Sequence, residues 1–237
     1  MRLGATVPDF TAQTTHGPIR FYNWLGNSWC ILFSHPADFT PVCTTELARM
    51  AERAFEFTKR GVRMIGHSCD SVAKHLVWLQ DIRSFARNLP AEFPYPIIAD
   101  ETRELAVALD MLDESERTAE GDPVSVRAVL IIAPDRRLRL SMYYPNTTGR
   151  NVDEILRVID SLMLTERLRV VTPVDWTMGD DLMVDTTSGP SQCGTVPRAA
   201  VPENRVETVQ MPSGLAYVRK TKFYYDSSPS TCEFWDS

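Results

Sequence analysis

Residues 29–47, with the sequence WCILFSHPADFTPVCTTEL, hold a strand, a loop and the start of a helix in direct succession. Trp29 to Ser34 form a short apolar run of strand length, and apolar residues then recur at helical spacing from Leu47 to Phe55. A polar loop that contains two prolines joins the two elements. A strand that passes into a helix in this way is the repeating unit of layered α/β folds.

The same alternation of strands and helices continues along the chain. Short apolar runs predict further strands at residues 62–66, 96–98, 128–132 and 138–144, and helical spacing predicts further helices at residues 72–82, 105–112 and 151–162. The run from Ala128 to Ile132 is apolar throughout, which is typical of a central strand covered on both faces. We therefore predict an α/β domain over residues 1–166, with a mixed sheet flanked by helices.

The amino-acid composition of the sequence changes after Thr165. Prolines and glycines divide the remaining chain into short extended pieces, yet apolar residues such as Trp176 and Leu182 stay frequent. We therefore predict an extended C-terminal arm over residues 167–223 that packs on another surface, with a second subunit as the favoured partner. Residues 224–237 are expected to form a poorly structured tail.

The overall composition excludes several classes of protein. The 237 residues are 43% hydrophobic and 24% charged, which is ordinary for a globular chain. A net charge of -6 argues against a nucleic-acid partner, because phosphate binding requires a basic surface. The sequence shows no apolar stretch near the roughly 20 residues of a membrane helix and no signal-peptide core at its start. We therefore expect a cytoplasmic protein without integral membrane association.

The cysteines and histidines show no paired spacing. Five cysteines stand at positions 30, 43, 69, 193 and 232, and no Cys-x-x-Cys occurs among them. Zinc ribbons, thioredoxin-type redox pairs and dense disulfide frameworks all need closer or paired spacing. The four histidines likewise show no spacing with carboxylates that compels a metal site, so we predict no metal. The remaining interpretation is that most of the cysteines are free thiols and that the protein resides in a reducing compartment.

Cys43 is the cysteine whose surroundings favour reactivity. It falls in the first turn of the predicted helix, with Pro41 near the helix start, where the missing N–H has little consequence. The unpaired N–H groups and the positive end of the helix dipole stabilise a thiolate there. Thr40 can turn its hydroxyl toward the sulfur and toward an oxygen-bearing ligand. The competing interpretation of any single cysteine is plain packing.

The spacing Pro36-x-x-x-Thr40-x-x-Cys43, embedded in Pro-Val-Cys-Thr-Thr-Glu, resembles the peroxidatic loop of the peroxiredoxins. Further stretches that share the resemblance are Val7-Pro8-Asp9-Phe10, Phe33-Ser34-His35-Pro36, Thr147-Thr148-Gly149-Arg150-Asn151 and Thr172-Pro173-Val174-Asp175-Trp176. Together they resemble the 1-Cys, type 6 subfamily over residues 3–220. The resemblance implies a thioredoxin-like fold, a homodimer, and a thiol peroxidase that reduces hydrogen peroxide and organic hydroperoxides.

The resemblance also implies roles for residues in and next to the loop. Cys43 is the peroxidatic nucleophile, Thr40 the hydroxyl that hydrogen-bonds the peroxide, and Pro36 the residue that shields the pocket from water. His35 lines the substrate pocket together with Val42. For His35 the competing interpretation is a histidine that is merely packed.

Three charged residues outside or behind the loop complete the implied site. Arg127 is the fixed cation, and its position agrees with physical expectation, because a charge at the start of a buried strand needs an anionic partner. An ion pair with a carboxylate is the alternative role for Arg127. Glu46 and Arg150 match a pair that orients the loop from behind, with a plain salt bridge as the alternative.

The implied reaction converts the Cys43 thiolate to a sulfenic acid and needs no metal or organic cofactor. Cys193 and Cys232 stand in contexts unlike a resolving cysteine, so an external thiol such as glutathione is expected to restore Cys43. Cys30 and Cys69 are expected to be packing residues. A rival hypothesis is a redox-sensing or holdase-type interaction protein, in which Cys43 is oxidised but turnover is incidental.

A second activity is predicted to be absent. Some type 6 peroxiredoxins are described as phospholipases A2 that use a Ser, a His and an Asp, and Ser28 and Asp135 match two of these positions. Tyr22 stands where the histidine would be. A phenol with a pKa near 10 is a poor general base at neutral pH, so we predict no efficient lipase activity.

Overall fold

The computed structural model describes residues 1–185 and 199–222. The contacts between residues divide the chain into two compact units, Met1–Val152 and Asp153–Ser237. The sequence analysis assigned the helix near residue 151 to the end of the first domain, whereas by its contacts this helix falls in the second unit. The predicted tail over residues 224–237 lies outside the described residues.

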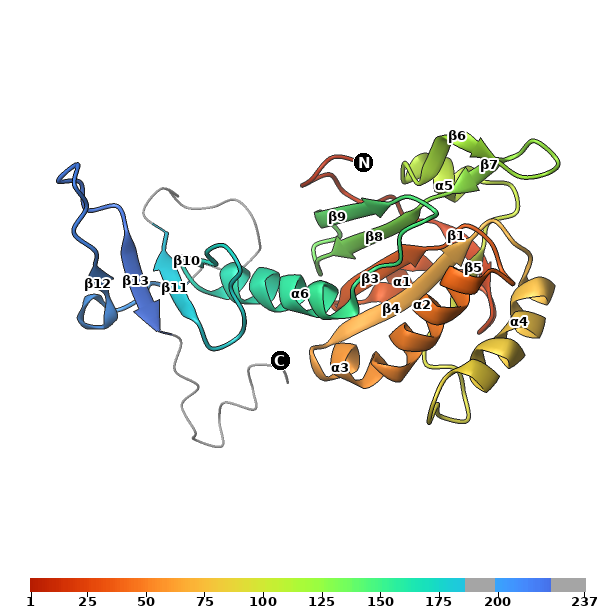
Figure 1. Ribbon diagram of the computed structural model, residues 1–237, viewed down its shortest axis with the longest axis horizontal. Coiled ribbons are helices and arrows are strands. Elements are labelled where there is room, and N and C mark those ends of the chain that lie inside the picture. The colour runs from red at the N-terminus through yellow and green to blue at the C-terminus, as the bar shows by residue number, and fades with distance from the viewer. Residues whose placement is uncertain (186–198, 223–237) are drawn as a thin grey trace. The chain divides into compact units, whose positions relative to one another are not determined.

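The first unit is built on a seven-stranded mixed sheet, shown in Figure 1, with the strand order β2-β1-β5-β4-β3-β8-β9. The strands are β1 (Thr11–Thr14), β2 (Ile19–Arg20), β3 (Trp29–Ser34), β4 (Val62–Ser68), β5 (Ile97–Ala99), β8 (Arg127–Ile132) and β9 (Leu138–Tyr144). Strands β3, β4 and β5 run parallel, while β8 pairs antiparallel with β3 and with β9. The predicted α/β fold with a mixed sheet is confirmed.

Helices connect the strands of this sheet. They are α1 (Phe21–Leu25), α2 (Pro41–Glu52), α3 (Ala54–Lys59), α4 (Val72–Phe85) and α5 (Glu104–Ala108). Helices α2 and α4 pack against each other, as Figure 1 shows. The connection from β3 to β4 runs through α2 and α3, and the connection from β4 to β5 runs through α4, as parallel neighbours require.

One predicted helix is wrong in part. The sequence predicted a helix over residues 105–112, but α5 ends at Ala108 and strand β6 (Leu112–Arg117) begins where the helix was expected to finish. Asp110 adopts a left-handed backbone conformation with φ of 63°, which ends the helix. Strand β6 then pairs with β7 (Pro123–Ser125) in a separate two-stranded sheet.

Strands β3 and β8 form the centre of the core. Every residue of both strands is buried, as the continuous apolar run in β8 predicted. Cys30 and Leu32 of β3 pack in one cluster with Leu130 and Ile132 of β8. Such burial fixes the ends of both strands, and the functional groups described below lie at one of these ends.

The second unit has a small sheet of its own. The four strands of this sheet are β10 (Val170–Val171), β11 (Asp181–Val184), β12 (Glu207–Thr208) and β13 (Arg219–Lys222), in the order β10-β11-β13-β12. The unit also contains the helix α6 (Val152–Arg167) and a 3-10 helix (Glu203–Arg205). Leu164, Val170, Trp176 and Leu182 form its buried core. The short extended pieces predicted for the arm thus pair with one another.

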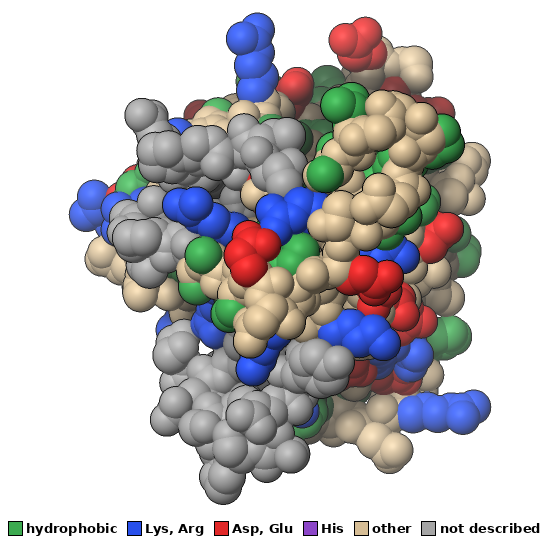
Figure 2. Space-filling view, turned by 90° about the vertical axis from the view of Figure 1, so that its left-hand side faces the viewer, with side chains coloured by type: hydrophobic (Ala, Val, Ile, Leu, Met, Phe, Trp, Pro, Cys, Tyr) green, Lys and Arg blue, Asp and Glu red, His purple; other side chains and the backbone are tan. Residues whose placement is uncertain are grey.

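The surface and the helices agree with the charge and hydropathy of the sequence. On the face drawn in Figure 2, the Lys and Arg side chains of the described residues alternate with Asp and Glu side chains. That mixture fits a chain in which 25 basic and 31 acidic residues give a net charge of -6. Within the described parts of the chain, every helix is too short or too polar to span a lipid bilayer.

Candidate active site

Cys43 lies in the first turn of α2, directly after the loop that leaves β3. Thr40 is the N-cap residue with an extended backbone, and Pro41 is the first helical residue, as the sequence predicted. The Cys43 side chain is 0% exposed. The free N–H groups and the positive end of the dipole of α2 therefore lie next to a sulfur that water does not reach.

Arg127, the first residue of β8, places its guanidinium against this sulfur. Its Nη1 atom donates to Cys43 Sγ at 3.2 Å, and the residue is only 2% exposed. The Nε and Nη2 atoms donate to the Asn146 carbonyl at 3.2 and 2.9 Å, which fixes the plane of the guanidinium. A charge-assisted hydrogen bond from a held cation stabilises a thiolate.

Glu46, one turn after Cys43 on α2, joins two arginines behind the sulfur. Its Oε2 atom accepts from Arg127 Nη1 at 2.7 Å and from Arg150 Nη2 at 2.9 Å. Its Oε1 atom accepts from the backbone N–H and from Nε of Arg150 at 2.7 and 2.9 Å. Burial raises the pKa of Glu46, but the two arginines outweigh it and hold this pKa below its usual value.

Arg150 also ties the helix to the sheet. Its Nη1 atom donates to the carbonyls of Ser34 on β3 and Ala128 on β8, both at 2.8 Å. Arg127 and Arg150 bring two positive charges to this buried place and Glu46 brings one negative charge. The group therefore carries one positive charge in excess, and this charge lies next to the Cys43 sulfur.

The loop residues predicted for the substrate pocket lie around the same helix end. The Thr40 hydroxyl donates to the Ala37 carbonyl at 2.9 Å, so its oxygen keeps lone pairs that can accept a hydrogen from a peroxide. Pro36 and Val42 are half-buried. The structure thus gathers Thr40, Cys43, Glu46, Arg127 and Arg150 at one site.

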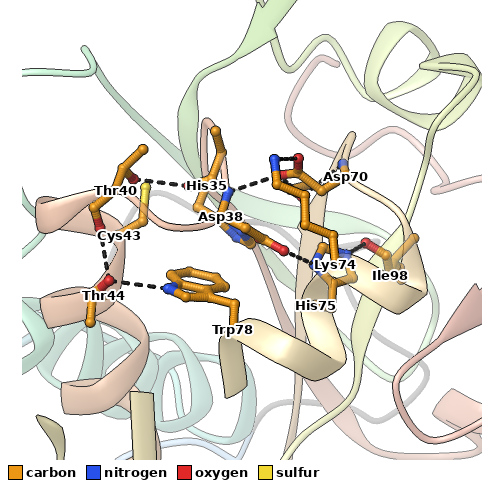
Figure 3. A network of polar contacts seen from close by, with 12 residues as sticks. His35, Asp38, Thr40, Cys43, Thr44, Asp70, Lys74, His75, Trp78 and Ile98 are labelled. Atoms are coloured by element: carbon orange, nitrogen blue, oxygen red, sulfur yellow. Dashed lines mark hydrogen bonds and ion pairs between the residues drawn. The ribbon is translucent and has the colours of Figure 1, made fainter. Parts of the chain in front are cut away.

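His35 belongs to a second polar network beside the loop, drawn in Figure 3. Its Nε2 atom lies 2.8 Å from Asp38 Oδ1, and the other carboxylate oxygen lies 2.6 Å from Nδ1 of His75 on α4. The Trp78 ring lies 5.1 Å from the His35 ring, and its Nε1 donates to the Thr44 hydroxyl at 3.2 Å. The sequence analysis missed Asp38, His75 and Trp78.

The same network offers the only cluster of metal-ligand type among the described residues, with ligand atoms of His35, Asp38 and His75 within 4.8 Å of one another. Its nitrogen–oxygen distances of 2.8 and 2.6 Å are hydrogen-bond lengths. A tetrahedral zinc with bonds of about 2.0 Å would hold its ligands roughly 3.3 Å apart. The donor set is thus closed by hydrogen bonds and does not fit a resident metal as it stands.

The other described cysteines lack these features. Burial raises the pKa of Cys30 well above its usual value. Burial, with a contribution from Asp100, raises the pKa of Cys69 to about 12. Both thiols therefore stay protonated at neutral pH, in agreement with packing roles. Cys193 and Cys232 lie outside the described residues.

Two of the three positions that match the lipase group, Tyr22 and Asp135, hold structural contacts instead. The Tyr22 hydroxyl donates to the Val7 carbonyl at 2.7 Å, and Arg136 lies 4.4 Å from the centre of its ring. Asp135 accepts from Arg139 at 2.7 Å. These contacts occupy the groups that a hydrolytic relay would need to be free.

Comparisons with known proteins agree with this site. The model of the AhpC/TSA family matches residues 3–141. Peroxiredoxin-6 of Gallus gallus is 53% identical over 220 residues, which are 92% of this chain and 96% of that protein, and peroxiredoxin-6 of Homo sapiens is 51% identical over the same shares.

Solved structures show the same similarity. A crystal structure of a cysteine-to-serine mutant of peroxiredoxin 6 of Arenicola marina has a TM-score of 0.86 and 49% identity, covering 95% of this chain and all (100%) of that chain. A yeast mitochondrial 1-Cys peroxiredoxin has a TM-score of 0.76 and 38% identity, covering 94% and 100%.

The chain belongs to the AhpC/TSA family and is a peroxiredoxin, a thiol peroxidase with a thioredoxin-like fold. Its similarities assign it, within that class, to the 1-Cys, peroxiredoxin-6-like subfamily. The resemblance inferred from the loop and the flanking motifs is thereby confirmed.

Proposed function

We propose that Cys43 is the peroxidatic nucleophile and that it reduces hydrogen peroxide and organic hydroperoxides by a 1-Cys mechanism. The observation that carries this proposal is the Cys43 sulfur, fully buried in the first turn of α2 and 3.2 Å from the Arg127 guanidinium. Helix dipole, cation and burial all act on this one thiol. Cys30 is equally buried, but Cys30 lies within strand β3 and Cys69 follows strand β4, so neither stands in the first turn of a helix.

The reaction follows from the placement of the groups. The thiolate attacks the terminal peroxide oxygen, so that a sulfur–oxygen bond forms while the oxygen–oxygen bond breaks. The electron pair leaves on the departing oxygen, which takes a proton and becomes water or an alcohol. Arg127 stabilises the charge that develops on this oxygen, and the Thr40 oxygen accepts the hydrogen of the bound peroxide.

An external thiol is proposed to restore Cys43, and no resident metal or organic cofactor is required. The yeast mitochondrial relative has a thiol resolving mechanism via glutathione and thioredoxin systems, which supports a reductant of this kind here. Sustained peroxide consumption with glutathione, unchanged by a metal chelator, is the expected result. Consumption that stops after one turnover with every thiol tried would favour a redox sensor or holdase.

Trapping of the sulfenic acid tests the identity of the nucleophile. Dimedone added with one equivalent of hydrogen peroxide should label Cys43 and leave Cys30 and Cys69 unlabelled, as read from peptide masses. The thiols of Cys30 and Cys69 are the natural internal controls, because burial raises both pKa values. A label on another cysteine, with Cys43 unmodified, would overturn the assignment.

We further propose that the protein acts as a cytoplasmic homodimer. The free thiols of Cys30, Cys43 and Cys69 fit a reducing compartment. The sheet of the first unit ends in β9, whose outer edge is bonded to Gly4 and Ala5 at Leu138 and has no partner strand beyond that residue within the described chain. An unpaired edge of this kind is a surface on which a second copy can pair.

A further inference from the structure

Trp78, in the middle of α4, is a buried residue with a polar atom that the reaction described above does not use. It is 0% exposed, and its ring centre lies 5.1 Å from that of His35 and 6.4 Å from that of Phe39. Its Nε1 atom donates to the Thr44 hydroxyl at 3.2 Å, as Figure 3 shows. The one N–H of the indole ring is thus bonded to the first turn of α2.

The Thr44 hydroxyl joins this bond to the start of the helix. It donates its one hydrogen to the Thr40 carbonyl at 2.8 Å, so toward Trp78 it can only accept. The same carbonyl accepts the Thr44 backbone N–H at 3.0 Å, which is the first hydrogen bond of α2. A chain of two hydrogen bonds therefore runs from the Trp78 indole to the N-cap residue, and each bond polarises the next.

Trp78 and Arg127 hold this turn in different ways. Among the hydrogen bonds of the described residues, that of Trp78 is the one that joins residues 40–44 to α4. Arg127 holds the turn through the Cys43 sulfur itself, at 3.2 Å. Oxidation changes this sulfur but none of the atoms between Trp78 and Thr40. The Trp78 bond therefore outlasts the first step of the reaction.

The sulfenic acid that this step leaves on Cys43 can react further in two ways. When a thiol attacks its sulfur, a sulfur–sulfur bond forms, the sulfur–oxygen bond breaks and the oxygen leaves as water. When its sulfur attacks a second peroxide, a new sulfur–oxygen bond forms and the oxygen–oxygen bond breaks, which gives a sulfinic acid and water or an alcohol.

The state of the turn decides between these two reactions. Arg127 and Thr40 surround the sulfur only while the turn is closed, so the closed turn favours the reaction with a second peroxide. A bulky thiol needs the turn to open, because Cys43 is 0% exposed.

Opening of the turn separates Thr44 from Trp78. Thr44 follows Cys43 directly, so unwinding at Cys43 breaks the bond between the Thr44 N–H and the Thr40 carbonyl. Trp78 stays in place, because it lies within a helix of 14 residues and is fully buried. Its N–H then loses its acceptor, and a buried donor without a partner is unfavourable. The bond therefore adds to the free energy of opening.

We propose that Trp78 is a positioning residue that holds the first turn of α2 closed through Thr44, and that it thereby sets how the Cys43 sulfenic acid divides between reduction by a thiol and oxidation to the sulfinic acid. This inference rests on the proposed role of Cys43. Loss of the bond should favour reduction, so that the enzyme tolerates more peroxide before it is inactivated.

Two substitutions remove this bond from its two sides. Trp78→Phe keeps a buried aromatic ring without the N–H, and Thr44→Val keeps the shape of the side chain without the hydroxyl. Thr44→Ser keeps the hydroxyl. The matched control is Tyr95→Phe, because Tyr95 is 1% exposed and its hydroxyl donates to the Leu47 carbonyl at 2.8 Å. It removes an aromatic donor from the same helix, beyond the first turn.

Two readouts follow the fate of the sulfenic acid. Each protein is oxidised with one equivalent of hydrogen peroxide and mixed with glutathione or dithiothreitol, and dimedone added at set times labels the sulfenic acid that remains, as read from peptide masses. In a second series, each protein turns over hydrogen peroxide with excess thiol, and the same peptide gives the peroxide concentration at which half of Cys43 is sulfinic acid. The stopped-flow rate of the first oxidation is measured beside both.

We expect the sulfenic acid of Trp78→Phe and of Thr44→Val to react with thiol about 3- to 10-fold faster than that of the native chain, the range that one hydrogen bond supplies. The peroxide concentration for half conversion to sulfinic acid should rise by a similar factor. Thr44→Ser and Tyr95→Phe should keep the native values. The double variant should match the single variants, because both substitutions remove the same bond.

Native values in both Trp78→Phe and Thr44→Val would overturn the proposal, as would an equal shift in Tyr95→Phe or a native sulfenic acid that neither thiol reduces. A slower first oxidation with an unchanged division of the sulfenic acid would overturn it too. If Trp78→Phe fails to fold by circular dichroism, Thr44→Val beside Thr44→Ser decides. If Thr44→Val also fails to fold, the bond serves stability and the proposal falls.

The same experiment separates this proposal from the assignment of the nucleophile. A native chain in which dimedone does not label Cys43 would overturn the proposed role of Cys43 and the control by Trp78 with it. A native chain that is labelled there, beside variants that divide the sulfenic acid as the native chain does, would overturn the control by Trp78 alone.

Discussion

The Cys43 sulfur meets its partners because two residues distant in sequence share one end of the sheet. Arg127 begins β8, Cys43 follows β3 in the chain, and these two strands are antiparallel neighbours. Glu46 then fixes the guanidinium from the same helix that carries the thiol. A substitution at any of these positions acts on a preformed electrostatic arrangement, and its effect should show in the oxidation step.

Thr40 offers the most selective substitution in the loop. Thr40→Val keeps the shape of the side chain and removes the oxygen that accepts the peroxide hydrogen, so oxidation of Cys43 should slow by about 100-fold. Thr40→Ser keeps the hydroxyl and should stay close to the native rate. Stopped-flow mixing with hydrogen peroxide measures the oxidation rate of both variants. Equal rates in the Val and Ser variants would show that the hydroxyl does not contact the substrate.

Acid should destabilise the fold through the His35 network. Burial lowers the pKa of His35, so the unfolded chain binds a proton that the folded chain lacks once the pH falls below about 6.5. Burial raises the pKa of Asp38, but hydrogen bonds from His35 and His75 hold it at about 2. Its stabilising contribution is therefore complete above about pH 4 and is lost toward pH 2.

Urea unfolding at a series of pH values measures this effect. The native chain should lose about 2 kcal/mol of unfolding free energy through Asp38 between pH 4 and pH 2, because its folded pKa lies below its unfolded value. Asp38→Asn should show a shallower dependence in this window. Parallel curves for the two proteins would contradict the role given to the Asp38 carboxylate.

The sequence predicted those site residues that a short motif or a buried charge reveals. Thr40 and Cys43 follow from the loop spacing, and Arg127 was expected to face an anion because it opens an apolar strand. Asp38 and His75 could not be predicted in this way. Their contact depends on α4 packing beside the loop, and no pattern within either segment shows which side chains meet across that distance.

Helix α2 shows which of its features the apolar spacing of the sequence predicts and which it does not. Apolar spacing from Leu47 to Phe55 revealed a helix, but the helix starts earlier, at Pro41, and ends at Glu52. Its first turn, Pro41 to Thr44, was located by the proline near the helix start and not by the apolar spacing. Arg53, with φ of -97° and ψ of 6°, separates it from α3, a break that apolar spacing does not show.

The first turn of α2 is also where recycling should open the structure. Cys43 is fully buried, so a bulky thiol cannot reach its sulfenic acid unless this turn moves. Phe39, just before it, has a left-handed φ of 59°, an unfavourable conformation that opening would release. Oxidation should therefore speed amide hydrogen exchange in the segment 36–47.

Exchange measured by mass spectrometry on reduced and peroxide-treated protein tests this expectation. The matched reference is α5, whose exchange should not change, because its first N–H groups are bonded to Asp100 and not to the segment 36–47. Identical exchange of residues 36–47 in both states would contradict opening of this turn as the route for the reductant.

In the whole molecule, the arm was the least predictable part. Its composition indicated short extended pieces that pack, and the structure pairs four of them in a sheet. Strands of two to four residues give too few positions for a period-2 pattern, so their pairing could not be predicted.

The proposed homodimer predicts the mass of the protein in solution. Light scattering after gel filtration should give about twice the chain mass of 26.8 kDa. A proline at a position of β9 whose N–H faces the outer edge should shift the protein toward a monomer if this edge carries the interface. A native protein that elutes and scatters as a monomer would contradict the assembly.

The chain should also lack phospholipase activity. Tyr22 donates its hydroxyl to the Val7 carbonyl and is a poor base, so fatty-acid release from phospholipid vesicles should stay at background. Ser28→Ala provides the control. Robust hydrolysis by the native chain that disappears in Ser28→Ala would contradict this prediction.

Loss of hydrogen peroxide on mixing with pre-reduced protein tests the role of Cys43, with and without excess dithiothreitol, for the native chain and for Cys43→Ser. The native chain should consume peroxide in a single stoichiometric turnover without thiol and continuously with thiol, while Cys43→Ser should do neither. Equal behaviour of the two proteins would contradict the role of Cys43 and would leave it a packing residue at the start of α2.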